Sequence, residues 1–99
     1  MPGMKYNIPD RLMKDITRTA EKYGVETIVL FGSRARGSHS DRSDVDLAVK
    51  CGFFDGFCED LKENAHSLLM FDLIDLNGPV SNELKNEIER DGIVIYEKA

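Results

Sequence analysis

The chain has 99 residues, of which 41% are hydrophobic, and it carries 13 Lys and Arg against 18 Asp and Glu, for a formal net charge of −5. This length allows one domain, residues 1–99, but not the two-domain architecture of most enzymes that join two substrates. The acidic balance argues against general nucleic-acid binding, which requires a basic face. Because long apolar runs and a secretory apolar core are missing, we expect a cytoplasmic protein without a membrane partner.

The first half of the chain predicts one helix and two strands. Apolar residues recur at spacings of three and four from Ile8 to Tyr23, which predicts an amphipathic helix over residues 9–23. Strands are predicted at residues 25–31 and 45–50. The polar segment between them, residues 34–43, is expected to form a short helical turn followed by a loop.

The second half continues the alternation of helices and strands. Residues 57–69 predict a helix, with an apolar face formed by Phe57, Leu61, Ala65, Leu68 and Leu69. A strand is predicted at residues 70–76, then a helix capped by Ser81 and running to about Asp91, and a short final strand at residues 93–96. Cys51 and Cys58 do not form a paired-cysteine motif, so we expect free thiols.

One motif stands out from this pattern. Gly32-Ser33 follows the first predicted strand, and after ten residues Asp44-Val45-Asp46 opens the second. Residues two apart in a strand point to the same side, so both carboxylates are expected to face one point while Val45 faces the core. Two like charges held so close need cations between them. The motif therefore predicts a phosphate-binding turn that faces a metal site. The alternative is a turn beside a strand edge that carries two solvated acids.

The stretch FGSRARGSHSDRSDVDLAV, residues 31–49, resembles the signature of the minimal nucleotidyltransferases, the smallest members of the DNA polymerase β-like nucleotidyltransferase superfamily. The order of elements and the ending DGIVIYEK are similar too. The resemblance implies an α+β fold, a small mixed β-sheet of about four strands packed against helices. It also implies transfer of a nucleoside monophosphate from a nucleoside triphosphate to an acceptor hydroxyl.

The residues suit this chemistry. Nucleotidyl transfer depends on positioning and charge neutralisation, so Asp44 and Asp46 are the expected ligands of Mg²⁺, with two ions in the site. Gly32 would let the backbone approach the phosphates, and Ser33 would offer its hydroxyl and N–H. Arg36, in preference to Arg34, is the candidate to pair with the triphosphate of ATP.

The resemblance also implies a third carboxylate on a neighbouring strand, and the candidates are Asp72 and Asp75. A separation of three places them on opposite faces of a strand, so only one can face the site. Asp72 is preferred because it lies near the start of its strand, whereas Asp75 is close to a turn. It would hold a metal and take the proton from the attacking hydroxyl.

Two classes of function remain open. The first is an enzyme that transfers AMP from ATP to a hydroxyl of a partner protein. Minimal nucleotidyltransferases are often antitoxins paired with a helical HEPN-domain protein, an RNase toxin silenced by AMP addition to a tyrosine, and the resemblance implies such a partner. The second is a non-catalytic module that inhibits its partner by binding alone. Transfer to a small molecule is a further alternative, weakened by the short length of the chain.

Overall fold

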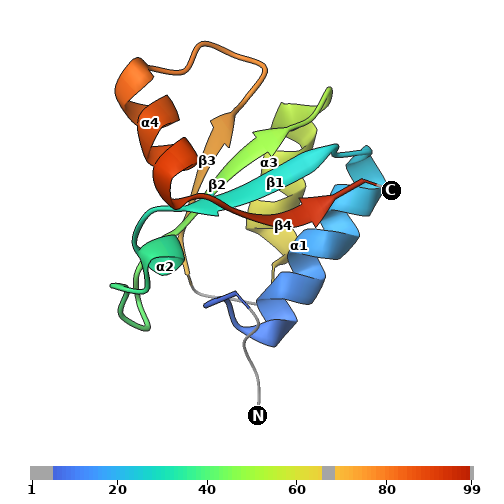
Figure 1. The fold of residues 1–99 in the computed structure, drawn as a ribbon. Coiled ribbons are helices and arrows are strands. Elements are labelled where there is room, and N and C mark those ends of the chain that lie inside the picture. Colours follow the sequence, from blue (N-terminus) through green and yellow to red (C-terminus); the bar gives the residue numbers. More distant parts are fainter. Residues whose placement is uncertain (1–5, 66–68, 99) are drawn as a thin grey trace.

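A computed structural model describes residues 6–65 and 69–98 of the chain. Helices and strands alternate along it, as the sequence predicts (Figure 1). The elements are α1 (Asp10–Tyr23), β1 (Thr27–Phe31), α2 (Ser33–Arg36), β2 (Val45–Lys50), α3 (Phe54–Asn64), β3 (Phe71–Asp75), α4 (Asn82–Asp91) and β4 (Ile93–Glu97).

The strands form one mixed sheet in the order β3-β2-β1-β4. β1 pairs antiparallel with both β2 and β4, whereas β2 and β3 run parallel. A parallel pair needs a crossover connection, and α3 provides it, so β2, α3 and β3 form a βαβ unit. The expected α+β fold with a small mixed sheet is confirmed.

The core lies between one face of this sheet and the helices α1 and α3. Leu12 and Ile16 of α1 pack there with Leu47 of β2 and with Phe57 and Leu61 of α3, and all five are buried. These positions follow the helical period of the sequence on the helices and its period of two on the strand. The opposite face of the sheet, which carries the polar residues of β2, is left for the site.

Helix α4 is attached differently and has no buried residue. Ser81 caps it as predicted, since its hydroxyl accepts a hydrogen bond from the Leu84 N–H at 3.2 Å. At the other end, a Cβ on Gly92 would collide with the Ile88 carbonyl and lie 2.7 Å from Val29 Cγ1. Glycine at this position therefore lets the end of α4 pack closely on β1.

The largest differences from the predicted boundaries are at β1 and α3. The strand predicted from residue 25 begins at Thr27, because the N–H of Val25 is used by the Ala20 carbonyl at the end of α1. The helix predicted over residues 57–69 spans Phe54–Asn64 and ends at Ala65, whose backbone is extended. Leu69 lies outside it, and Leu68 falls outside the described residues.

Candidate active site

Strand pairing brings two of the predicted carboxylates together. Asp46 of β2 is the register partner of Asp72 of β3, so the two side chains lie next to each other on one face of the sheet. Asp75 pairs with Val49, which is buried on the opposite face. The prediction that Asp72, and not Asp75, lies on the same face as Asp46 therefore agrees with the register.

Asp44 completes the group from the residue just before β2. It is exposed, whereas Asp46 is half-buried beside it. Burial, together with the negative charges of Asp72, Asp44 and Glu87, raises the pKa of Asp46 to about 6, against the opposing effect of Arg36. Burial and the neighbouring negative charges thus both disfavour the ionised form of Asp46, and a bound cation would oppose both effects.

The glycine of the motif is required by the carboxylate that faces it. Gly32 has a φ of 75°, and a Cβ built on it would collide with Asp46 Oδ2. Its carbonyl accepts hydrogen bonds from the N–H groups of Ala35 and Arg36, both at 3.1 Å, so the turn leads directly into α2. Ser33, half-buried, is the first residue of that helix. The backbone of Gly32, just after β1, and the carboxylate of Asp46 in β2 are therefore in direct contact.

Arg34 has a structural position instead of a phosphate-facing one. Its side chain is only 2% exposed. The guanidinium donates hydrogen bonds to the carbonyls of Asn7 at 2.7 Å and Ser43 at 3.1 Å, and to those of Ser40 and Asp41 at 3.4 and 3.2 Å. Arg34 therefore holds the loop that leads to Asp44. Because its donors are used by these carbonyls, its side chain is not available to bind a triphosphate. This position argues against the less favoured interpretation of the sequence, in which Arg34 pairs with the triphosphate.

Arg36 is half-exposed at the mouth of the site and remains the candidate phosphate ligand. Its Nη1 lies 3.6 Å from both Glu87 Oε2 and Asp91 Oδ2 of α4. Asp91 also accepts a hydrogen bond from Arg90, with an Nη2 to Oδ2 distance of 2.8 Å. Of the two acids beside Arg36, Asp91 is thus the one shared with a second arginine. The sequence alone does not identify these two acids, because the helical pattern of α4 does not indicate that Glu87 and Asp91 lie near Arg36.

Within residues 6–65 and 69–98, no three His, Cys, Asp or Glu side chains are close enough to coordinate one metal ion by themselves. Mg²⁺ is commonly bound by one or two carboxylates together with substrate phosphates. Asp44, Asp46 and Asp72 fit that arrangement, since they are oxygen donors with an unbalanced negative charge on one face of the sheet.

Comparison with known families agrees with this arrangement. A family model described as "Polymerase beta, Nucleotidyltransferase" matches residues 14–99. The chain belongs to this family. The match includes the Gly32-Ser33 turn and all of the carboxylates described above. No curated protein matches the chain, and none of the helices in the described part is long and apolar enough to cross a membrane.

Solved structures share the nucleotidyltransferase fold. A toxin–antitoxin complex with AMP-PNP matches with a TM-score of 0.68 and 21% identity, covering 87% of this chain and 73% of that one. An MntA-HpeT toxin–antitoxin mutant gives 0.67 and 22%, with the same coverage. A complex of tri-AMPylated Shewanella oneidensis HEPN toxin with MNT antitoxin gives 0.61 and 19%, covering 87% and 70%.

Substituting the two arginines should separate stability from site chemistry. Arg34→Ala removes a buried guanidinium that satisfies several carbonyls, so we expect a loss of about 2 to 4 kcal/mol in the free energy of unfolding. Arg36→Ala removes only ion pairs that are partly exposed, so its loss should stay below about 1 kcal/mol. Urea unfolding of both variants measures the difference. Equal losses would contradict the structural position of Arg34.

The pKa of Asp46 predicts a pH-dependent stability. Between its ordinary value of 3.8 and about 6, the folded chain keeps a proton that the unfolded chain has lost, so stability falls as pH rises through this range. Asp46→Asn removes the effect and should be more stable than the wild type at pH 7.5 by about 1 kcal/mol, discounted because the carboxylate is partly exposed. At pH 3.5 the two should converge.

The measurement is urea unfolding at both pH values in the presence of EDTA. Asp41→Asn, which changes an exposed aspartate in the loop before Asp44, is the matched control and should follow the wild type at both pH values. A wild type that is as stable as Asp46→Asn at pH 7.5 would contradict the raised pKa of Asp46.

Proposed function

We propose that this chain is a Mg²⁺-dependent enzyme that transfers AMP from ATP to a hydroxyl of a partner protein, as the antitoxin of a HEPN-domain toxin. The observation that carries the proposal is the convergence of Asp46, Asp72 and the Gly32 backbone at one end of the sheet. Membership of the nucleotidyltransferase family supports the reaction class. The similar structures named as toxin–antitoxin complexes, one holding AMP-PNP and another an AMPylated toxin, support the nucleotide and the partner.

Each residue of the site has a role in this proposal. Asp44, Asp46 and Asp72 would hold the metal ions, because their charges repel one another on a single face. When bound, Mg²⁺ neutralises phosphate charge and polarises the reacting phosphoryl group. Gly32 and Ser33 would face the phosphates, since glycine permits close backbone approach. The Arg36 guanidinium would leave Glu87 and Asp91 to bind the triphosphate.

The transfer is a displacement at the α-phosphorus of ATP. The acceptor oxygen forms a bond to this phosphorus while the bond to the bridging oxygen of pyrophosphate breaks, and pyrophosphate leaves. The hydroxyl proton passes to the carboxylate of Asp72, which is exposed and beside Asp46. The acceptor must approach from solvent on the face of the sheet opposite to α1 and α3. A partner protein bound to this face would enclose the site.

Replacing each of the two candidate carboxylates of β3 by Asn, in separate variants, tests the role of Asp72. Asp72→Asn removes a metal ligand and the proton acceptor, so we expect kcat to fall by at least about 100-fold. Asp75→Asn changes an acid on the other face of the same strand and should alter kcat less than about threefold. The rates are measured at saturating partner and ATP. The reverse order would show that the wrong face of β3 has been assigned to the site.

The decisive experiment uses as acceptor the product of the neighbouring gene, which this proposal predicts to be a HEPN-domain protein. The two proteins are incubated with Mg²⁺ and isotope-labelled ATP, and the partner is analysed by intact-mass and peptide mass spectrometry. We expect an added AMP on a tyrosine, serine or threonine, which is lost with Asp46→Asn or with EDTA and kept with Asp41→Asn.

Other outcomes would contradict the proposal. A tight complex with an unmodified partner, inhibited equally well by Asp46→Asn, would favour a module that acts by binding alone. An unmodified partner, with label appearing on an aminoglycoside that is added in a parallel incubation, would favour transfer to a small molecule.

A further inference from the structure

A cavity lies far from the carboxylates of the candidate active site, at the other end of the same strands. Cys51 directly follows β2 and Asp75 ends β3, and both line this cavity of about 370 Å³. Along β2, Cys51 is about 16 Å from Asp46 at the rise of an extended strand. Asp75 also lies on the opposite face of the sheet from Asp72, because its register partner is the buried Val49. The cavity is therefore separate from the proposed nucleotide site.

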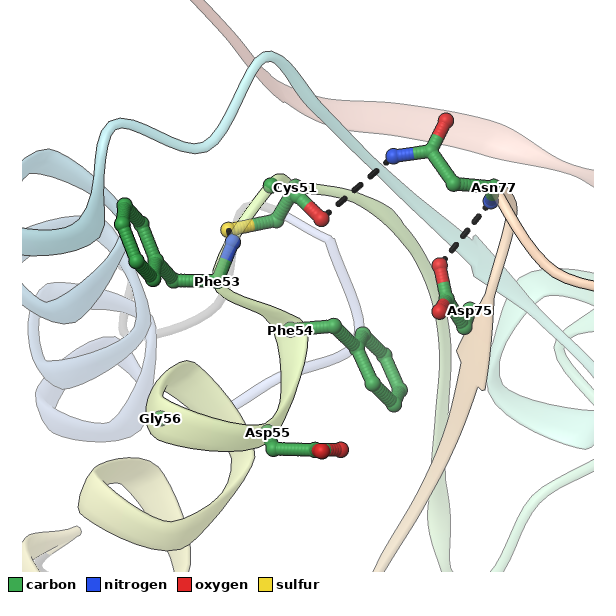
Figure 2. Close-up of a pocket in the computed structure, with 8 residues that line it drawn as sticks. Cys51, Phe53, Phe54, Asp55, Gly56, Asp75 and Asn77 are labelled. Atoms are coloured by element: carbon green, nitrogen blue, oxygen red, sulfur yellow. Dashed lines mark hydrogen bonds between the residues drawn. The ribbon is translucent and has the colours of Figure 1, made fainter.

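The walls of the cavity are held by hydrogen bonds. Asn77 donates from its side chain to the Cys51 carbonyl at 3.3 Å and from its backbone N–H to Asp75 Oδ1 at 2.9 Å. Cys51 Sγ accepts the N–H of Phe53 at 3.4 Å. Figure 2 shows the hydrogen bond between Asn77 and Cys51 joining the loop after β2 to the segment after β3. Hydrogen bonds thus fix the residues at the edge of the cavity. Its volume is near the lower end of the range for small-ligand sites.

Two carboxylates and two aromatic side chains determine its chemistry. Figure 2 shows Phe53 and Phe54 pointing in opposite directions, with Phe54 directed into the space between α3 and β3, where Asp55 and Asp75 lie. Phe53, at the rim, is 73% exposed, the highest fraction among the exposed large hydrophobic side chains of the described residues. None of the ion pairs found among residues 6–65 and 69–98 includes Asp55 or Asp75.

We propose that this cavity docks an arginine side chain that a partner protein presents next to an apolar residue. A guanidinium is the complementary group, because it pairs with carboxylates through parallel N–H bonds and also stacks on an aromatic ring. The exposed Phe53 would bury against the neighbouring apolar residue. The chain has a net charge of −5, which adds attraction for a basic segment. This surface does not depend on nucleotide transfer and leaves the open face of the sheet free.

The test uses the full chain, labelled with ¹⁵N, and two short peptides as probes. The peptide acetyl-Leu-Arg-Leu-amide is titrated in parallel with acetyl-Leu-citrulline-Leu-amide, which has nearly the same shape without the charge. With the arginine peptide, we expect the amide signals of Gly52, Asp55, Gly56 and Asn77 to shift, and binding to the citrulline peptide to be about tenfold weaker. Shifts that are equal for the two peptides, or that occur elsewhere, would overturn the proposal.

Variants identify the contributing groups. Asp55→Asn and Asp75→Asn should each weaken binding of the arginine peptide by about tenfold, and Phe53→Ala by a smaller factor. Glu59→Gln, which removes an exposed acid one turn further along α3, should bind like the wild type. Amide spectra without peptide establish that each variant is folded. If Mg²⁺ alone shifts the same signals, the cavity is a cation site and the docking proposal is wrong.

Discussion

Parallel pairing between β2 and β3 forces like charges together, and the rest of the site is arranged around that repulsion. The register sets Asp46 beside Asp72, and the strand period adds Asp44 from the same side. The nearby positive charge comes from Arg36, which is shared with two acids of α4. Together with burial, the nearby negative charges raise the pKa of Asp46 to about 6, so this position of the sheet contributes less to stability as the pH rises from 3.8 to 6.

Local periodicity was enough to predict much of this arrangement. Asp44 and Asp46 share a face because of a rule that acts within one strand, and Asp72 and Asp75 were separated by the same rule. Which of the latter two faces Asp46 depends on the register between strands, and the sequence favoured Asp72 only through its position in the strand. The structure supplies the pairing, and it agrees with that choice.

Interactions between distant segments could not be predicted in the same way. A buried arginine is rare, and nothing near Arg34 indicates that four carbonyls from two segments surround its guanidinium. The partnership of Arg36 with Glu87 depends on how α4 packs against β1, which is a tertiary property. The start of α3 was missed for a local reason, since Phe53 precedes it without a side-chain cap.

The way Arg34 holds the loop before Asp44 has a consequence for how this protein can diversify. The guanidinium contacts backbone carbonyls, which every residue type provides, so these hydrogen bonds place no requirement on the exposed side chains of Ser38 and Arg42. Substitutions at these two positions would change the surface of the loop before Asp44 while the contacts of Arg34 stay in place. Surface variation in this loop is therefore uncoupled from the hydrogen bonds that hold its backbone.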